Sequence, residues 1–272
     1  MNGKSLRLKR IISPADGRTV IFPLDHGVTS GPLPGLERMG EVISMGLGAG
    51  VDALVLHKGM IRFLDPITKC PPGIIMHLSA STRLGPSVNY KTLVGSVEEA
   101  IRLGAEGVSV HVNLGDSHEP EMLSDLGMVA DSCTEWQFPL LVMIYVKGDR
   151  AASGQDIAHA ARIAAELGAD IVKIPFPESY EILSRITASL PVPVVIAGGT
   201  PAGTIESVLE MVENALRAGA SGVAAGRNVF QHSRPNLVLR AIRNIVHRGF
   251  LAEKALTEIE GLKAQTGGPA SH

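Results

Sequence analysis

The sequence predicts a single-domain (β/α)8 barrel over residues 1–265, and a repeated pattern is the first reason. Four segments share a glycine, a small residue and a short β-rich run: GAGVDALVLHKG, GAEGVSVHVNLG, GADIVKIPF and GASGVAAGRN. Each follows an amphipathic stretch, such as SVEEAIRLGAE or TIESVLEMVENALRAGAS. A glycine that ends a helix before an apolar strand is typical of the loops in repeated βαβ units.

Four further apolar runs bring the expected strands to eight: TVIFPLD, GIIMHLS, FPLLVMIY and VPVVIAGG. Nearly continuous apolar runs are typical of parallel strands that helices cover. Eight strands alternating with helices favour a closed barrel over the alternative, an open doubly wound sheet. The chain shows no linker, and we expect disorder only in the tail, residues 266–272.

Composition limits the class of protein. The chain has 272 residues, of which 45% are hydrophobic and 19% charged, and barrels of this fold commonly reach about 250 residues. A net charge of −2 without a basic block argues against nucleic-acid and membrane partners and favours small molecules. Cys70 and Cys133 form no CxxC motif, and the N-terminal segment lacks the apolar core of a signal peptide, which predicts a cytoplasmic protein.

One lysine lies inside an apolar run that otherwise predicts a buried strand. Lys173 stands in GADIVKIPF, at the end of the barrel where active sites form. Its neighbours Val172, Ile174 and Phe176 would favour the neutral amine, because burial penalises the charged form. A neutral lysine can attack a carbonyl and form a Schiff base, which predicts carbon–carbon bond chemistry.

Other strand-end residues fit the same chemistry. Tyr145 ends the strand LLVMIY and could donate or accept a proton, and Asp25 ends the first strand in PLDHGV. The structural alternatives are a tyrosine with a buried ring and a surface hydroxyl, and a lysine that only forms an ion pair. That ion pair would join Lys173 to Asp25 or to Asp170.

The last two strands end in glycines and predict a phosphate site. Gly198 and Gly199 follow one strand, and Gly226 and Arg227 follow the next. The loops after strands seven and eight are the usual phosphate site of a barrel, where backbone N–H groups meet the anion. The structural alternative is that these glycines only form tight turns.

A metal site is the rival chemistry. His57, His77 and His111 end consecutive strands, and three imidazoles can hold Zn²⁺ in a metal-dependent aldolase or hydrolase. Against it, neither an HxH nor an HExxH motif is present, and a metal enzyme has no need for a buried lysine. We therefore predict no metal and no cofactor, and treat His57 and Lys58 as candidate substrate contacts.

Six segments together resemble the archaeal-type class I aldolase family: IFPLDHGVTSGPLPGL, ALVLHKG, GVSVHVNLG, LGADIVKIPF, VVIAGG and GVAAGRNVFQH. The resemblance runs from about residue 20 to about residue 248. It implies Lys173 as the Schiff-base lysine, Tyr145 as the proton donor and Asp25 as the acid–base carboxylate. It also implies a set of substrate and phosphate contacts: His26, Gly27, Val28, Thr29, Val146, Lys147, Gly198, Gly199, Gly226 and Arg227.

The resemblance also implies a reaction. An enzyme of this type joins a three-carbon unit from a ketose phosphate to L-aspartate 4-semialdehyde, giving a seven-carbon amino keto acid on a route to aromatic amino acids. It is expected to work as a ring-stacked homo-oligomer, such as a decamer. The alternatives are a dihydroxyacetone-phosphate aldolase of aminohydroxybenzoate biosynthesis, a fructose-bisphosphate aldolase and a non-catalytic phosphate sensor.

One departure bears on the acceptor substrate. The chain reads Tyr-Val-Lys-Gly at 145–148, where the family is expected to read Tyr-Pro-Arg-Gly. Lysine lacks the planar fork with which arginine binds a carboxylate or phosphate. Beyond Lys58 and Lys147, no cluster of cations for a second phosphate is visible, which favours the semialdehyde over glyceraldehyde 3-phosphate.

Overall fold

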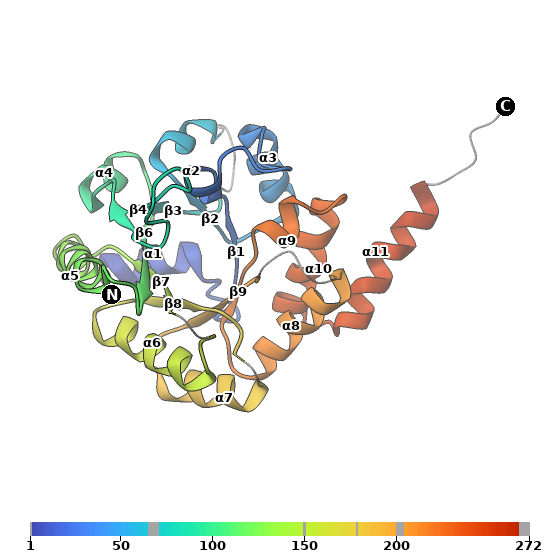
Figure 1. Cartoon of the computed structure of the whole chain (residues 1–272). Helices are drawn as coiled ribbons and strands as arrows, with labels where there is room; N and C mark the ends of the chain where they lie inside the picture. Colours follow the sequence, from blue (N-terminus) through green and yellow to red (C-terminus); the bar gives the residue numbers. More distant parts are fainter. Residues whose placement is uncertain (1, 65–70, 149–150, 178, 200–203, 267–272) are drawn as a thin grey trace.

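The computed structural model describes residues 2–64, 71–148, 151–177, 179–199 and 204–266. Eight parallel strands close into a barrel in the order β1-β10-β9-β8-β7-β6-β3-β2 (Figure 1). The barrel strands are β1 (Thr19–Pro23), β2 (Ala53–Leu56), β3 (Gly73–His77), β6 (Gly107–Leu114), β7 (Leu140–Val146), β8 (Ile171–Ile174), β9 (Val194–Ala197) and β10 (Gly222–Ala224). Each falls on one of the eight expected runs, with β7 extending one residue past its run, so the predicted fold is confirmed.

Helices surround the barrel in Figure 1. The longer ones are α3 (Met39–Ala49), α5 (Glu119–Glu135), α6 (Gly154–Glu166), α7 (Tyr180–Ser189), α8 (Ile205–Arg217), α10 (Pro235–Arg248) and α11 (Ala252–Thr266). Shorter elements are α1 (Gly3–Ile11), α2 (His26–Ser30), η1 (Lys58–Phe63), β4 (Ser79–Ala80), β5 (Thr92–Leu93), α4 (Val97–Arg102) and α9 (Arg227–Phe230). The expected tail lies outside the described residues from residue 267 onward.

Local sequence sets the ends of these helices. Helix α6 begins with a capping box, in which the Ser153 side chain accepts from the Asp156 N–H and the Asp156 carboxylate accepts from the Ser153 N–H. Helix α10 begins at Pro235, which lacks the N–H that a first turn leaves unpaired. It ends at Gly249, whose φ of 65° lies in the left-handed region that favours glycine.

Strand alternation divides the core into two clusters. Ile21, Val55, Ile75 and Val195 pack with one another inside the barrel, whereas their neighbours along each strand pack outward against the helices. Successive side chains of a strand point to opposite faces, so each strand supplies both clusters. Both faces are therefore apolar, which is why the runs look continuous in the sequence.

The N-terminal segment forms a helix, α1, that packs against the barrel. From the sequence we infer only that this segment lacks the apolar core of a signal peptide. Ile11, at the end of α1, is 1% exposed and packs with the residues inside the barrel. The Thr19 hydroxyl donates to the Ile11 carbonyl at 2.6 Å. A Cβ at Gly73 would lie 2.5 Å from the Arg10 carbonyl oxygen, so the first residue of β3 has to be glycine. Helix α1 thus closes the amino-terminal end of the barrel.

Cys133 is buried on α5, and Cys70 lies outside the described residues. Among the helices that the structure describes, none is long and apolar enough to cross a membrane.

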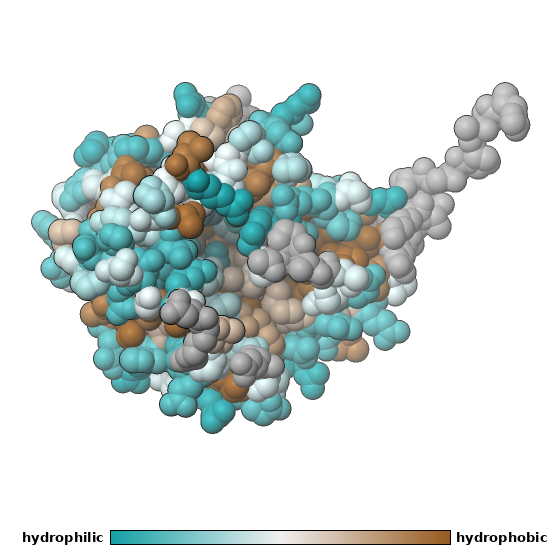
Figure 2. Space-filling view, viewed as in Figure 1, coloured by the Kyte–Doolittle hydropathy of each residue, from teal (hydrophilic) through white to brown (hydrophobic). Residues whose placement is uncertain are grey.

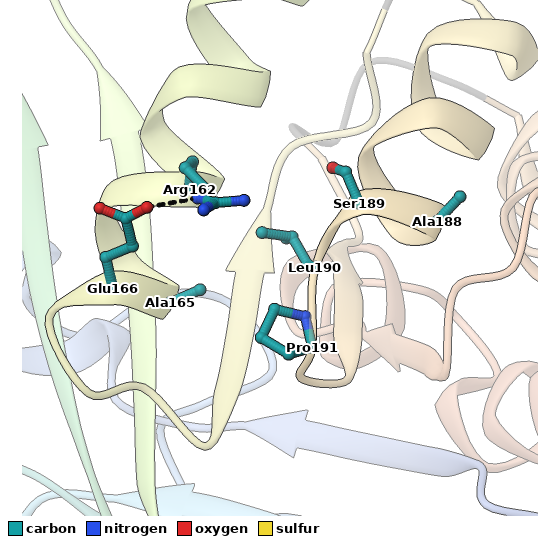
Figure 3. Close-up of a pocket in the computed structure, with 7 residues that line it drawn as sticks. All are labelled: Arg162, Ala165, Glu166, Ala188, Ser189, Leu190 and Pro191. Atoms are coloured by element: carbon teal, nitrogen blue, oxygen red, sulfur yellow. Dashed lines mark hydrogen bonds and ion pairs between the residues drawn. The ribbon is translucent and has the colours of Figure 1, made fainter.

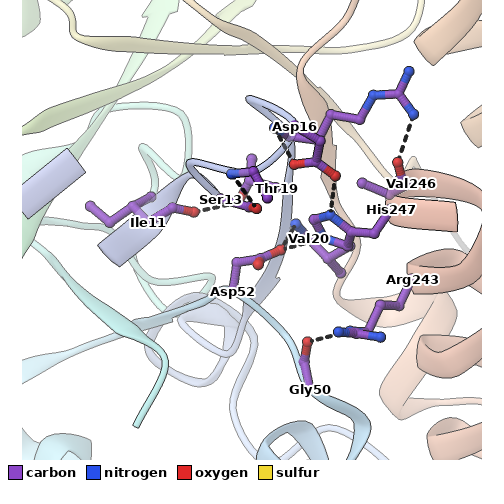
Figure 4. Close-up of polar contacts among 12 residues, drawn as sticks. Ile11, Ser13, Asp16, Thr19, Val20, Gly50, Asp52, Arg243, Val246 and His247 are labelled. Atoms are coloured by element: carbon purple, nitrogen blue, oxygen red, sulfur yellow. Dashed lines mark hydrogen bonds and ion pairs between the residues drawn. The ribbon is translucent and has the colours of Figure 1, made fainter. Parts of the chain in front are cut away.

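A charged cluster joins α10 to the amino-terminal end of the barrel (Figure 4). His247 lies 2.7 Å from Asp16 through Nδ1 and 2.9 Å from Asp52 through Nε2. Asp52 also accepts from the Val20 N–H at 2.6 Å. An imidazole donates from both nitrogens only when it is protonated. Burial lowers the pKa of His247, but the hydrogen bonds to Asp52 and Asp16 outweigh burial and raise that pKa above its ordinary value.

We expect this cluster to make stability depend on pH. Because the pKa of His247 is raised on folding, its stabilisation is complete below the ordinary histidine pKa of about 6.5 and is lost as pH rises through the folded-state pKa. His247→Gln should therefore lower the free energy of unfolding by roughly 1–2 kcal/mol at pH 6 and by less at pH 9. Urea unfolding at both pH values measures this difference.

The exposed His159 of α6 provides the matched control. His159→Gln should change the unfolding free energy little at either pH. An equal loss for His247→Gln at pH 6 and pH 9 would show that the ring stabilises the fold only by packing.

Candidate active site

The carboxyl-terminal ends of the barrel strands surround a cavity of about 270 Å³. Figure 2 shows the molecule hollowed near the centre of the face on view. This end of the barrel is where enzymes of this fold carry their active sites. The predicted site residues that line the cavity are Asp25, His26, Thr29, His57, Tyr145, Lys147, Lys173 and Arg227.

Lys173 points into the barrel from β8. Its side chain is almost fully buried, with a relative exposure of 7%, and Nζ lies 3.7 Å from the Met143 sulfur. The sequence predicts that Val172, Ile174 and Phe176 surround the Lys173 amine. This prediction is wrong, because successive side chains of a strand point to opposite faces. Those three side chains pack with the outer core, on the side of the helices.

Asp25, not Asp170, is the carboxylate near Lys173. Asp170 pairs with Lys4 at 2.9 Å and accepts from the Leu140 N–H, so it lies at the opposite end of the strand. Asp25 lines the same cavity as Lys173 and acts on it electrostatically. The structural alternative of a Lys173–Asp170 ion pair is therefore wrong.

Asp25 lies between two histidines, and 16% of its side chain is exposed. Its Oδ2 lies 3.7 Å from His77 Nε2, and its Oδ1 lies 3.8 Å from His26 Nδ1. Burial raises the pKa of Asp25, but attraction to His77, His26 and Lys173 outweighs burial and holds that pKa well below its ordinary value. Within the described residues, Oδ1 has no hydrogen-bond partner. The site thus contains a carboxylate with one oxygen free to accept a hydrogen bond.

His77 connects Asp25 to Ser109. Its Nδ1 lies 2.8 Å from the Ser109 hydroxyl, and its Nε2 faces Asp25. Burial lowers the pKa of His77 to about 3 against the attraction of Asp25, so the ring is neutral at pH 7. A neutral ring that accepts from Ser109 at Nδ1 would carry its proton on Nε2, directed at Asp25.

The three strand-end histidines contact other side chains of the site. The His111 Nε2 lies 3.0 Å from the Asn113 amide oxygen, and the His57 ring packs edge-on against His77 at 5.2 Å between centroids. Among the described residues, no group of three or more His, Cys, Asp or Glu side chains could hold a metal ion.

Tyr145 and Lys147 enter the cavity from β7. The Tyr145 ring packs against His111 with centroids 4.9 Å apart, and Lys147 Nζ lies 5.6 Å from the centre of the tyrosine ring. Because β7 is hydrogen-bonded to β8 with Met143 opposite Lys173, Tyr145 lies farther along the strand, toward the mouth of the cavity. This arrangement places a phenol and an ammonium near the buried lysine.

The two glycine-ended strands lie side by side, as predicted for a phosphate site. Strand β9 pairs with β10, and the Gly198 N–H donates to the Ala224 carbonyl at 3.0 Å. A Cβ at Gly226 would lie 2.7 Å from the His26 ring, so glycine is required there. Arg227 lines the cavity beside this turn. Residues 200–203, which follow Gly199, lie outside the described residues.

Several predicted contacts do not line this cavity: Gly27, Val28, Lys58, Val146, Gly198, Gly199 and Gly226. Lys58 is the clearest case, because its ammonium pairs with Glu99 at 3.1 Å and its side chain is 47% exposed. Val28 is exposed, and Val146 packs against the outer core.

The cavity also contains cations that the sequence did not reveal. Arg83 and Lys91 line it together with Lys147. The expectation that no cation cluster exists beyond Lys58 and Lys147 is therefore wrong. Lys91 stands in NYKTL, a polar context that resembles any surface loop. The β4–β5 hairpin buries Lys91. Each of its strands has only two residues, which is too short to show a periodic pattern in the sequence.

A larger depression lies outside the barrel, between α6 and α7 (Figure 3). It encloses about 550 Å³ and is lined by the ends of both helices. Arg162 and Glu166, on its edge, pair with each other at 2.6 Å. In a barrel the helices end where the next strands begin, so this depression lies at the end remote from the strand-end residues. We assign it no chemistry.

A closed barrel with a buried lysine, a carboxylate and a phenol in one strand-end cavity has the parts of a Schiff-base aldolase. The chain belongs to the DeoC/LacD family of aldolases, whose family profile matches residues 19–232. It is an enzyme of the class I aldolase type, as the sequence predicts.

Relatives and solved structures agree with this family. The chain is 42% identical over 247 residues to the 2-amino-4,5-dihydroxy-6-oxo-7-(phosphonooxy)heptanoate synthase of Streptomyces griseus, covering 90% of each chain. It is 41% identical over 261 residues to 2-amino-3,7-dideoxy-D-threo-hept-6-ulosonate synthase 1 of Archaeoglobus fulgidus, covering 96% of this chain and 97% of the relative. An archaeal fructose 1,6-bisphosphate aldolase structure superposes with a TM-score of 0.82 at 30% identity, covering 90% of this chain and 99% of that one.

Proposed function

We propose that this enzyme joins a three-carbon unit from a ketose phosphate to L-aspartate 4-semialdehyde through an imine on Lys173. The product is a seven-carbon amino keto acid. The observation that carries the proposal is the buried Lys173 in one cavity with Asp25 and Tyr145. The names of both relatives describe seven-carbon chains with a 2-amino group. Seven carbons are the sum of a three-carbon unit and a four-carbon amino-acid aldehyde.

The steps balance with these three side chains. The Lys173 amine adds to the ketone of the donor, and loss of water leaves an imine. The adjacent carbon–carbon bond breaks into the imine to form an enamine, while the hydroxyl on the departing carbon gives up its proton. The enamine carbon then attacks the acceptor aldehyde, whose oxygen takes a proton, and water releases the product. Tyr145 transfers these protons, and Asp25 holds the cationic intermediates.

Donor and acceptor approach the imine from different sides. Arg227, which lines the cavity, binds the donor phosphate together with the strand-end turns beside it at Gly198, Gly199 and Gly226, because two adjacent turns and a guanidinium suit an anion. The acceptor enters on the side of Lys147.

A fructose-bisphosphate aldolase, whose acceptor is glyceraldehyde 3-phosphate, is the second candidate. The cations Arg83, Lys91 and Lys147 favour it, because together they could bind a second phosphate. The two functions share the imine on Lys173 and differ in the acceptor.

Competing acceptors decide between them. The value of kcat/KM should be much higher for L-aspartate 4-semialdehyde than for glyceraldehyde 3-phosphate, and mass spectrometry should detect a seven-carbon amino keto acid. Lys147→Ala should raise the KM of the semialdehyde more than it lowers cleavage of the donor alone, because a uniform binding contact affects KM. Preferential condensation of glyceraldehyde 3-phosphate would identify a fructose-bisphosphate aldolase instead.

The proposal extends to the setting of the enzyme. We propose a ring-stacked homo-oligomer that works in the cytoplasm, on a route to aromatic amino acids. The resemblance to the archaeal-type class I aldolases supports this setting. Light scattering on the purified enzyme would measure the oligomer, and a monomeric mass would contradict it.

A further inference from the structure

A second buried lysine lines the cavity. Lys91 is 9% exposed, against 7% for Lys173, and both side chains line the same space. Lys91 is close enough to Asp25 and Lys147 to interact with both electrostatically. The mechanism above has no role for this side chain.

The hairpin holds the Lys91 ammonium in a defined place. Its Nζ donates to the Ser81 hydroxyl at 2.5 Å, and that hydroxyl donates to the Val88 carbonyl at 2.7 Å. The Asn113 amide, at the end of β6, donates to the Asn89 carbonyl at 2.6 Å and ties the hairpin to the barrel. The ammonium is therefore positioned before any substrate binds.

The ammonium lacks a carboxylate partner. In the part of the chain that the structure describes, no Asp or Glu lies within ion-pair distance of Lys91, and Ser81 supplies one acceptor for its three N–H donors. Burial lowers the pKa of Lys91, although the attraction of Asp25 opposes this. An anion bound in the cavity would compensate the buried charge.

The strand order places Lys91 opposite the glycine turns. In the ring of eight strands, β3 and β9 are four positions apart in either direction. The hairpin that carries Lys91 follows β3, and Gly198 and Gly199 follow β9. Lys173 on β8 and Tyr145 on β7 lie between them along one half of the ring. A ligand that bridges the cavity can therefore have one anionic group at each side.

Basic side chains outnumber carboxylates in the lining of the cavity. Among the described lining residues, the basic side chains besides Lys173 are Lys91, Lys147, Arg83 and Arg227, and Asp25 is the carboxylate. The side chains of Arg83 and Lys147 are exposed, so the buried Lys91 is the cation that a donor phosphate beside Arg227 would leave without a counter-charge.

We propose that Lys91, assisted by Arg83 and Lys147, binds the anionic group of the acceptor aldehyde. The inference rests on the proposed aldol function and adds the residue that selects an anionic acceptor. That group is a carboxylate in L-aspartate 4-semialdehyde and a phosphate in glyceraldehyde 3-phosphate. Lys91 is a binding residue and takes no part in the imine.

Kinetics with paired acceptors test this role. Lys91→Met should raise the KM of the charged acceptor roughly 10–100-fold, the range for a lost charge-assisted hydrogen bond. Butanal is the neutral counterpart of the semialdehyde, and glyceraldehyde is that of glyceraldehyde 3-phosphate. For these neutral aldehydes, the KM of the variant should stay within about twofold of wild type. The pair whose charged member shows the larger rise in KM tells whether Lys91 binds a carboxylate or a phosphate. Borohydride trapping of the donor should stay at the wild-type level.

Three further variants separate charge from structure. Lys91→Arg should recover part of the lost affinity, because it retains the cation, and Ser81→Ala should give a smaller loss. Lys58→Met is the matched control, since Lys58 pairs with Glu99 away from the cavity and should not change acceptor KM. Circular dichroism would confirm that each variant folds.

A binding measurement keeps the test independent of turnover. L-Homoserine has the carboxylate of the semialdehyde and no aldehyde, and 3-amino-1-propanol lacks the carboxylate. Calorimetry should show weaker homoserine binding to Lys91→Met and unchanged, weak binding of the amino alcohol. If wild type condenses neither charged aldehyde, the proposed function fails, and the homoserine and inorganic phosphate titrations still test Lys91.

Two results would overturn the inference. One is an equal change for charged and neutral acceptors in folded Lys91→Met, which would mean that Lys91 only shapes the cavity. The other is loss of donor trapping in that variant, which would place Lys91 in the imine chemistry.

Discussion

Replacing Lys173 with methionine is expected to abolish both turnover and covalent capture of the donor. Methionine nearly matches the length and apolar stem of lysine, so the barrel interior should stay packed while the nucleophile is lost. In wild type, borohydride with a ketose phosphate should add the mass of the reduced donor to the peptide that contains Lys173. The variant should show no adduct and no detectable aldol cleavage.

The second buried lysine makes peptide mapping decisive. Lys91 lines the same cavity, so intact mass alone does not distinguish the two amines. An adduct on Lys91, or activity that a chelator removes and Zn²⁺ restores, would refute the imine on Lys173. Lys58→Met serves as the control and should trap the donor as wild type does.

Tyr145→Phe is expected to reduce turnover roughly 100-fold or more while retaining the covalent adduct. The substitution removes only the hydroxyl and leaves the ring packed against His111. Addition of Lys173 to the donor does not need the phenol, whereas proton transfer after imine formation does. Single-turnover kinetics, followed by borohydride trapping of the same sample, measures both steps.

The partner residue His111 supplies a contrast for this test. His111→Asn removes the ring against which Tyr145 packs, so it should lower turnover by less than the loss of the hydroxyl does. If Tyr145→Phe fails to trap the donor, the tyrosine acts in binding or folding rather than in proton transfer.

The barrel could be predicted because its signals are local. Each strand is a short apolar run, and four of them follow a helix that ends in glycine and a small residue, so the periodicity survives in the chain alone. Helix α1 was not predicted as part of the barrel, because GKSLRLKRI shows a basic face and its burial rests on one residue, Ile11. That contact exists only once the strands have closed into the barrel.

The candidate site was predictable wherever its residues end a regular strand. Lys173, Tyr145 and Asp25 all follow from strand position, and the structure brings them into one cavity. The neighbours of Lys173 were misassigned, because residues adjacent in the sequence point to opposite faces of a strand. Lys91 was missed for another reason: the β4–β5 hairpin that buries it has too few residues to show a period.

The amino-acid sequence by itself determined the eight-strand barrel, the buried lysine and the family, since each depends on patterns within a few neighbouring residues. Only the tertiary structure decided which charges meet. It paired Lys58 with Glu99, Asp170 with Lys4, and His247 with two aspartates from the amino-terminal end of the barrel. It also brought Lys91 opposite the glycine turns. Such pairings join residues dozens to hundreds of positions apart, and no local pattern encodes a distance between them.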